Sequence, residues 1–391
     1  MFYETQPVEQ QNEYKKMLSI VGSLSELFSE SDCPFLHYRA HENIFCKYFN
    51  ADNLARLDCS ADAKKNCVGL GLKTWMGRDD QKVAEFGKLR ETFEDLTGME
   101  LVQRIAEYRN ERIRITKNLH GIDTMIYHIV KRVPGAMQIF EHAFDMIDID
   151  NISLIENRGN VNNTYFTDGH HTYHFSTSKN TLYMIFDGME LLDVFDVEYM
   201  EDPYSFLMNL TEGETIREIT ETTDVVAVNE RLPQLCLRLY STKKDGTKFV
   251  AERSGLNQWN ARGRARDANE VYIPYQKEDR DRDLAFFPPR DTVFNLTLPD
   301  GTRIPAKVCQ EADKNNPLIG KSIMSNPNKI LGEWLLRNVF ELPEGTLVTY
   351  DMLQRFGVDS VVFTKLGDLE YSVDFSELGT YEKFYGEYSE E

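Results

Sequence analysis

Apolar residues recur every three or four positions in several segments of the first half of the chain. Residues 44–49 form one such segment, with Glu42 just ahead of it. This spacing is typical of a helix that buries one face. The same periodicity predicts further helices at residues 82–96, 101–108 and 136–144.

Shorter apolar runs predict strands. Residues 68–75 form one such run, and residues 152–186 have the pattern of a meander of short strands, with turns at residues 158–160 and at Asp168-Gly169. Glycine, asparagine and aspartate favour tight turns between strands. The first half of the chain is therefore predicted to be α/β at first and richer in β structure afterwards.

The chain is long enough for two domains. Its 391 residues exceed what one core usually serves, and 41% apolar residues suffice for two. A connector is predicted at residues 211–224, which hold five acidic residues, one basic residue and few large apolar ones. The predicted domains are residues 1–222 and 225–391.

Charge is distributed unevenly. The formal net charge of −20 argues against indiscriminate binding of nucleic acid, because affinity for phosphate grows with the number of neutralising cations. Residues 243–266 are a basic island, with seven Lys or Arg against Asp245 and Glu252. No long apolar run and no signal-peptide pattern is present, so we expect a cytoplasmic protein that does not span a membrane.

Lys73 lies near the end of the strand predicted at residues 68–75, fifteen residues after Asp58 and twelve before Glu85. If residues 58–60 pair with this strand around a turn at residues 63–66, Asp58 lies across from Gly71 or Lys73. A tighter turn would bring Asp62 there instead, so both aspartates remain candidates. Carboxylates can hold Mg²⁺ against a phosphate oxygen while an ammonium group neutralises growing charge, so this spacing suits phosphodiester hydrolysis.

The spacing resembles that of the PD-(D/E)XK nucleases, whose domain is a mixed sheet flanked by helices and whose strand motif has an acid two residues before the lysine. Gly71 occupies that position here. Some members carry this acid on the following helix instead, so the resemblance implies Glu85 in that role, with room left by Gly71. It also implies Glu42 as the glutamate of an upstream helix. Asp58 and Glu85 would then bind Mg²⁺, beside Lys73.

An arginine-rich polar segment at residues 254–270 leads into a β-type run. Arginine pairs bidentately with guanine or phosphate, and asparagine and glutamine can read adenine edges in the major groove. Further motifs follow at residues 286–288, 294–296, 306–310, 321–328, 331–334 and 371–375.

These motifs, in order and spacing, closely resemble the C-terminal B3-like DNA-recognition domain of the NgoFVII family of restriction endonucleases, which is shared with BfiI and EcoRII. The resemblance covers roughly residues 230–378. It implies a β-barrel-like domain with two arms that grip the major groove, at about residues 253–270 and 310–328. The DNA-binding residues that it implies are Asn257, Gln258, Asn260, Arg262, Arg264, Lys321, Ser322, Ser325, Asn326 and Asn328.

The NgoFVII enzymes carry a phospholipase-D-like nuclease domain with a His-x-Lys signature. None of the eight histidines here has a lysine two residues later, so a different catalytic module is expected. We expect a type II restriction endonuclease that cuts double-stranded DNA with Mg²⁺, acts as a homodimer and has a cognate DNA methyltransferase encoded nearby. Two alternatives stay open: a DNA-binding protein whose nuclease site is lost at Gly71, and a nuclease that depends on modified bases or on two bound sites.

A rival metal site consists of His170, His171 and His174. In a strand, His170 and His174 would share a face with Asp168, as zinc would favour. Solvated hairpin residues are the commoner interpretation of such a cluster.

Overall fold

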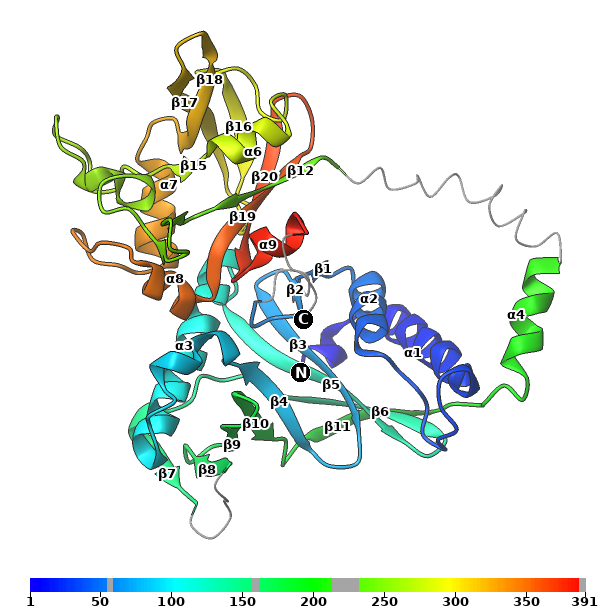
Figure 1. Ribbon diagram of the computed structural model, residues 1–391. Helices are drawn as coiled ribbons and strands as arrows, with labels where there is room; N and C mark the ends of the chain where they lie inside the picture. The colour runs from blue at the N-terminus through cyan, green and yellow to red at the C-terminus, as the bar shows by residue number, and fades with distance from the viewer. Residues whose placement is uncertain (55–58, 156–161, 213–231, 387–391) are drawn as a thin grey trace. The chain divides into compact units, whose positions relative to one another are not determined.

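The computed structural model describes residues 1–54, 59–155, 162–212 and 232–386 (Figure 1). Its contacts divide it into two compact units. The N-terminal unit consists of Met1–Asn110 and Ile122–Glu230, and the C-terminal unit of Glu111–Gly121 and Arg231–Glu391. The second half of helix α3 (Gly98–His120) thus belongs to the C-terminal unit, which the sequence-based division did not anticipate.

A six-stranded mixed sheet forms the centre of the N-terminal unit. Its order is β1-β2-β3-β5-β6-β11, with β3 parallel to β5 and every other pair antiparallel. Parallel neighbours need a long crossover, and the chain between them includes α3. The strands are β1 (Asp52–Asn53), β2 (Ala63–Lys65), β3 (Val68–Met76), β5 (Thr124–Val133), β6 (Ala136–Ala143) and β11 (Glu190–Asp196).

Helices α1 (Val8–Ser23) and α2 (Tyr38–Phe49) pack on this sheet. Phe45 and Phe49 of α2 share a buried core with Leu70 and Leu72 of β3. The helix predicted at residues 44–49 is therefore confirmed. It ends at Asn50, whose left-handed backbone (φ 50°) is a common way to end a helix.

The second sheet of the N-terminal unit is antiparallel, in the order β4-β10-β9-β8-β7. The predicted meander is confirmed over residues 163–185, whereas the turn at residues 158–160 lies outside the described residues. Its strands are β4 (Asp80–Glu85), β7 (Ser153–Leu154), β8 (Asn163–Thr167), β9 (Thr172–Ser176) and β10 (Thr181–Ile185). Shorter elements are η1 (Tyr3–Thr5), η2 (Ser25–Leu27), η3 (Gly87–Thr92), η4 (Ile149–Asn151) and helix α4 (Pro203–Glu212).

Two predicted helices are wrong. The helix predicted at residues 136–144 is instead strand β6 (Ala136–Ala143), in which Met137 and Ile139 alternate inward into the core. The segment predicted at residues 82–96 begins as β4 and continues as η3. The helix predicted at residues 101–108 is confirmed, because it lies within α3.

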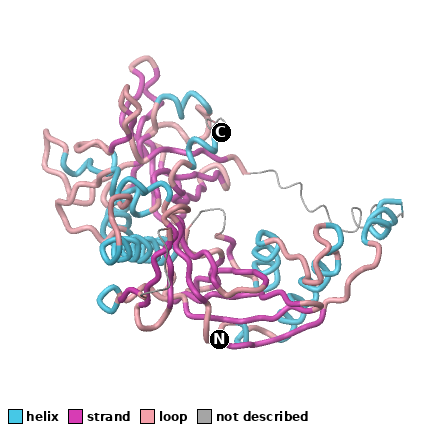
Figure 2. The backbone as a smooth tube through the Cα atoms, turned by 60° about the horizontal axis from the view of Figure 1, so that its bottom comes forward, coloured by secondary structure: helices cyan, strands magenta, loops and turns pink. Residues whose placement is uncertain are grey.

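The C-terminal unit is built on one sheet of order β12-β19-β20-β16-β17-β18-β15, in which only β16 and β20 are parallel among the described strands. Its first and last strands contact each other, so the sheet is nearly closed into a barrel. Figure 2 shows the strands of both units in magenta with helices in cyan beside them. The strands are β12 (Gln234–Arg238), β15 (Ile273–Pro274), β16 (Val293–Thr297), β17 (Arg303–Asp313), β18 (Asn316–Ser325), β19 (Val358–Lys365) and β20 (Glu370–Glu377).

The core of the C-terminal unit includes Ile115 and Leu119 of α3. Asn118 of the same helix donates to the Val339 carbonyl at 3.1 Å. No helix among the described residues is long and apolar enough to cross a membrane. The remaining elements are β13 (Ser241–Thr242), β14 (Lys248–Phe249), η5 (Gly255–Asn260), α6 (Lys277–Arg282), α7 (Ile330–Gly332), η6 (Glu333–Val339), α8 (Tyr350–Phe356) and α9 (Thr380–Phe384).

Candidate functional site

The hairpin that carries Lys73 has a tighter turn than the one first drawn from the sequence. Lys65 pairs with Val68, and Asn66 takes the left-handed conformation (φ 53°) that so short a turn requires. Residues 63–65 are thus part of a strand, and the predicted turn at residues 63–66 is wrong. Continuing this ladder sets Asp62 beside Gly71, and the Asp62 Oδ2 atom accepts a hydrogen bond from the Leu72 N–H at 2.7 Å.

Asp62 is therefore the aspartate that the observed turn brings to the strand of Lys73. Asp58, the first candidate, lies outside the described residues. The sequence predicted that Asp62 would take the place of Asp58 if the turn were tighter, and the structure has that tighter turn.

Asp62, Lys73 and Glu42 of α2 form one electrostatic cluster. Burial raises the pKa of Asp62, and the Lys73 ammonium and the Leu72 N–H oppose that shift. Burial and the charge of Asp62 raise the pKa of Glu42, against the effects of Arg39 and Lys73. The charge of Asp62 thus acts on Glu42, and the charge of Lys73 acts on both carboxyls.

Arg39 completes the cluster. Its Nη1 atom donates to Glu42 Oε2 at 2.9 Å, and the Glu42 side chain is 7% exposed while that of Arg39 is 48% exposed. The cluster therefore contains two carboxylates and two cations, with Arg39 and Glu42 on α2, Lys73 on β3 and Asp62 just before β2.

The oxygen donors of this cluster fit Mg²⁺, which is commonly bound by one or two carboxylates together with waters and substrate phosphate. Among the described residues, no group of three or more His, Cys, Asp or Glu is placed to hold a metal ion. Within that part of the chain, the protein ligands of such an ion would be Glu42 and Asp62.

Gly71 does not leave room for another carboxylate. A Cβ atom at this position would lie 2.7 Å from Tyr127 Cδ1 and 2.9 Å from Phe144 Cε1. The two rings stack with centroids 4.0 Å apart. The glycine is needed because the aromatic stack fills the space in which the sequence interpretation placed the migrated acid.

The helix that was to deliver Glu85 is absent, so this part of the prediction is wrong. Glu85 ends strand β4 of the second sheet, and its exposed carboxylate pairs with Lys82 at 2.8 Å.

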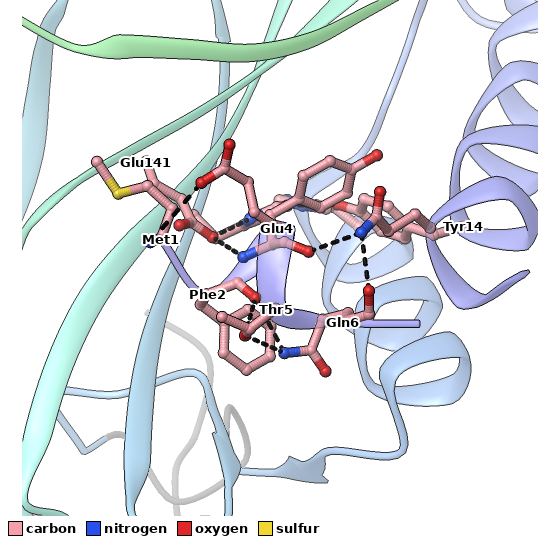
Figure 3. A network of polar contacts seen from close by, with 11 residues as sticks. Met1, Phe2, Glu4, Thr5, Gln6, Tyr14 and Glu141 are labelled. Carbon is pink, nitrogen blue, oxygen red and sulfur yellow. Dashed lines mark hydrogen bonds and ion pairs between the residues drawn. The ribbon is translucent and has the colours of Figure 1, made fainter. Parts of the chain in front are cut away.

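A buried polar network anchors the helix that carries Glu42, and Figure 3 labels two of its residues, Tyr14 and Glu141. The Tyr14 hydroxyl lies 2.9 Å from His41 Nε2 and 3.0 Å from His128 Nε2, and His128 Nδ1 lies 3.3 Å from Glu141 Oε1. The same oxygen accepts from the Tyr3 N–H at 2.8 Å. Sequence reasoning missed this network, whose only signal was isolated polar residues inside apolar segments.

The three histidines of the rival metal site do not converge. His174 stacks between Tyr165 and Tyr183 and faces Asp80 at 3.4 Å. His171 instead faces Asp145 at 3.5 Å, and His170 is exposed.

Four of the predicted DNA-binding residues are buried, and three of them form hydrogen bonds that hold the C-terminal unit together. Asn257 donates to the Val348 carbonyl and accepts from the Val348 N–H, both at 2.9 Å. Ser322 donates to the Cys309 carbonyl at 3.0 Å. Ser325 accepts from the N–H of Leu331 at 2.9 Å. Gln258 is also buried.

The remaining predicted residues face solvent wholly or in part. Arg262, Lys321 and Asn326 are exposed, as is Arg264, which pairs with the buried Glu270. Asn260 and Asn328 are half-buried, and Asn260 donates to the Glu252 carbonyl at 2.9 Å.

Arg266 shapes the first arm, a role that sequence reasoning missed. Its Nη1 atom donates to the carbonyls of Ala261, Arg262 and Arg264 at 2.7 to 3.3 Å, and its Nε lies 3.6 Å from Glu270. In the sequence Arg266 is one of several arginines in the arm, so its structural role can be recognised only from its burial and its contacts.

Comparison with known families identifies the domain type of the C-terminal unit. Residues 231–367 match the family described as the NgoFVII C-terminal B3-like DNA-binding domain. The matched range lies within the C-terminal unit and includes both arms and every strand of the nearly closed sheet except β20. No curated protein matches the chain.

Proposed function

We propose that this chain, whose residues 231–367 form a B3-like DNA-binding domain, is a sequence-specific DNA endonuclease of restriction type. The observation that carries the proposal is the cluster of Glu42, Asp62 and Lys73 in the other unit. A DNA-binding domain brings the substrate, and the cluster supplies groups suited to phosphodiester hydrolysis.

In this proposal Glu42 and Asp62 hold Mg²⁺. When bound, the ion would polarise a phosphate oxygen and lower the pKa of a water molecule. Lys73 orients the attacking water or neutralises charge that develops on the phosphate. The Leu72 N–H fixes one oxygen of Asp62, so the carboxylate is held before any ligand arrives.

Recognition belongs to the exposed arm residues, above all Arg262, Lys321 and Asn326. Because the described part of one chain offers one such cluster and a duplex has two scissile strands, we further propose that two chains act together. A nuclease of this kind also requires protection of the host DNA, which implies a cognate DNA methyltransferase.

The test is digestion of unmodified phage DNA with Mg²⁺ and, in a parallel reaction, with EDTA. We expect discrete fragments in the Mg²⁺ reaction only. Fragments that persist in EDTA would overturn the metal-dependent mechanism.

A second function, specific DNA binding without cleavage, is favoured by Gly71, because the acid usual at this position is missing. It predicts selection of one short sequence from random duplexes but intact phage DNA under all metal conditions.

A further inference from the structure

Arg39 occupies one oxygen of the Glu42 carboxylate, a ligand in the proposed metal site. Its Nη1 atom lies 2.9 Å from Glu42 Oε2. Arg39 belongs to the first turn of α2, three residues before Glu42, so both groups lie on the same side of the helix. A cation bound by Glu42 and this guanidinium would compete for the same lone pairs.

The charge of the cluster makes this competition strong. Two carboxylates, Glu42 and Asp62, stand against Arg39 and Lys73, and Arg39 also acts on Asp62. The cluster is therefore electrically balanced before any metal arrives. A divalent ion that enters the cluster would be repelled by both positive charges unless one of them moves away.

Arg39 is the cation able to move. Its side chain is 48% exposed, whereas Lys73 is half-buried on a central strand of the sheet. The Tyr38 ring, whose centroid lies 5.4 Å from Arg39 Cζ, offers the guanidinium a surface next to the cluster.

We infer that Arg39 is a phosphate-binding residue that changes partner when a divalent cation binds; this inference rests on the proposed function. Without metal, Arg39 neutralises Glu42. With metal on Glu42, the guanidinium is released to a DNA phosphate, which matches its planar fork. Metal and DNA then assist each other: the metal ion displaces Arg39 from Glu42 and frees it for phosphate, and phosphate holds Arg39 away from the metal ligand Glu42.

The first test measures Mn²⁺ binding to the full chain without DNA, by electron paramagnetic resonance at pH 8. We expect Arg39→Ala to bind Mn²⁺ about five- to tenfold more tightly than the unaltered protein, because a competing charge is gone. Alkaline conditions are needed, since loss of Arg39 raises the pKa of Glu42 further and protons would compete. Arg39→Lys should stay close to the unaltered protein.

Arg90→Ala is the matched control. Arg90 forms an exposed ion pair with Glu94 at 3.2 Å, outside the cluster, so its loss should leave Mn²⁺ affinity unchanged. Equal affinity in Arg39→Ala and the unaltered protein, with weaker binding in Asp62→Asn, would overturn the exchange and keep the proposed metal site. Affinity that does not depend on Asp62 would overturn both.

The second test measures how much Mn²⁺ tightens binding of a duplex that the unaltered protein has selected from random sequences. The gain should be several-fold smaller in Arg39→Ala than in Arg90→Ala. An undiminished gain would show that the released guanidinium does not reach phosphate.

Discussion

The candidate site residues of the two units lie in opposite environments. In the N-terminal unit Glu42 is 7% exposed and Asp62 is held by a backbone N–H, whereas Arg262 and Lys321 of the C-terminal unit project into solvent. Charges removed from water influence one another strongly, while exposed cations interact with phosphate by releasing bound ions. This difference supports the proposal that the N-terminal unit holds the reaction centre and the C-terminal unit the DNA-binding surface.

The largest expected effect is loss of cleavage without loss of binding. Lys73→Ala and Asp62→Asn should each lower the cleavage rate at least about 100-fold, because they remove transition-state charge stabilisation and a metal ligand. Affinity for a selected duplex should stay within a few-fold of the unaltered value. Both rates and affinities are measured on the same preparations.

Asp52→Asn is the control for Asp62→Asn, since Asp52 is exposed on the neighbouring strand β1. Glu85→Gln should cut normally. Full cleavage activity in Lys73→Ala would show that the cluster of Glu42, Asp62 and Lys73 does not act in cleavage. Loss of cleavage in Asp58→Asn but not in Asp62→Asn would show the same.

The domain type of the C-terminal unit was predictable because its motifs run in order through the whole domain. The roles of single residues were not. Asparagine suits both base recognition and backbone bridging, so only burial shows that Asn257 does the second.

In the N-terminal unit the sequence identified candidate residues, but it did not determine how they are arranged. Residues Glu42, Asp62 and Lys73 were candidates from sequence alone, but their register depended on a turn whose length the polar run at residues 63–67 does not determine. The inward-facing Met137 and Ile139 show why β6 was mistaken for a helix: both periodicities fit so short a segment.

The second prediction tests whether α3 contributes to the core of the C-terminal unit. Leu119→Ala should lower the free energy of unfolding of that unit by about 3 kcal/mol, because Leu119 is 2% exposed within its core. The readout is amide hydrogen exchange in β16 and β20. Leu89→Ala, equally buried in the N-terminal unit, should leave those strands protected, and the opposite pattern would contradict the assignment. A fragment that begins at residue 225 lacks Leu119 and should be less stable than the same unit in the full chain.

The third prediction concerns Asp359, an exception to the comparison because it is a fully buried carboxyl in the C-terminal unit. Burial raises its pKa to about 6, against the opposing effects of Lys248 at 4.0 Å and the Gly379 N–H. The folded state therefore binds this proton more tightly than the unfolded state, whose aspartate has a pKa of about 4. The free energy of unfolding should fall as the pH rises from about 4 to 6, by about 3 kcal/mol at most.

Urea unfolding across this pH range, compared between the unaltered protein and Asp359→Asn, measures that contribution. The variant should lack this part of the decline, and parallel curves would show that Asp359 titrates normally.

The smallest effects separate the two kinds of arm residue. Arg262→Ala should weaken binding of a selected duplex about tenfold without changing stability, because an exposed arginine contributes contacts to DNA and none to the core. Asn257→Ala should instead lower the free energy of unfolding by about 2 kcal/mol, since it leaves the N–H and carbonyl of Val348 without their buried partner.

Arg303→Ala, which removes an exposed arginine outside the arms, controls for loss of charge. Affinity at two salt concentrations and urea unfolding distinguish the outcomes. If Asn257→Ala weakened DNA binding without lowering the free energy of unfolding, Asn257 would contact DNA. Burial would then no longer distinguish arm residues that stabilise the fold from those that recognise DNA.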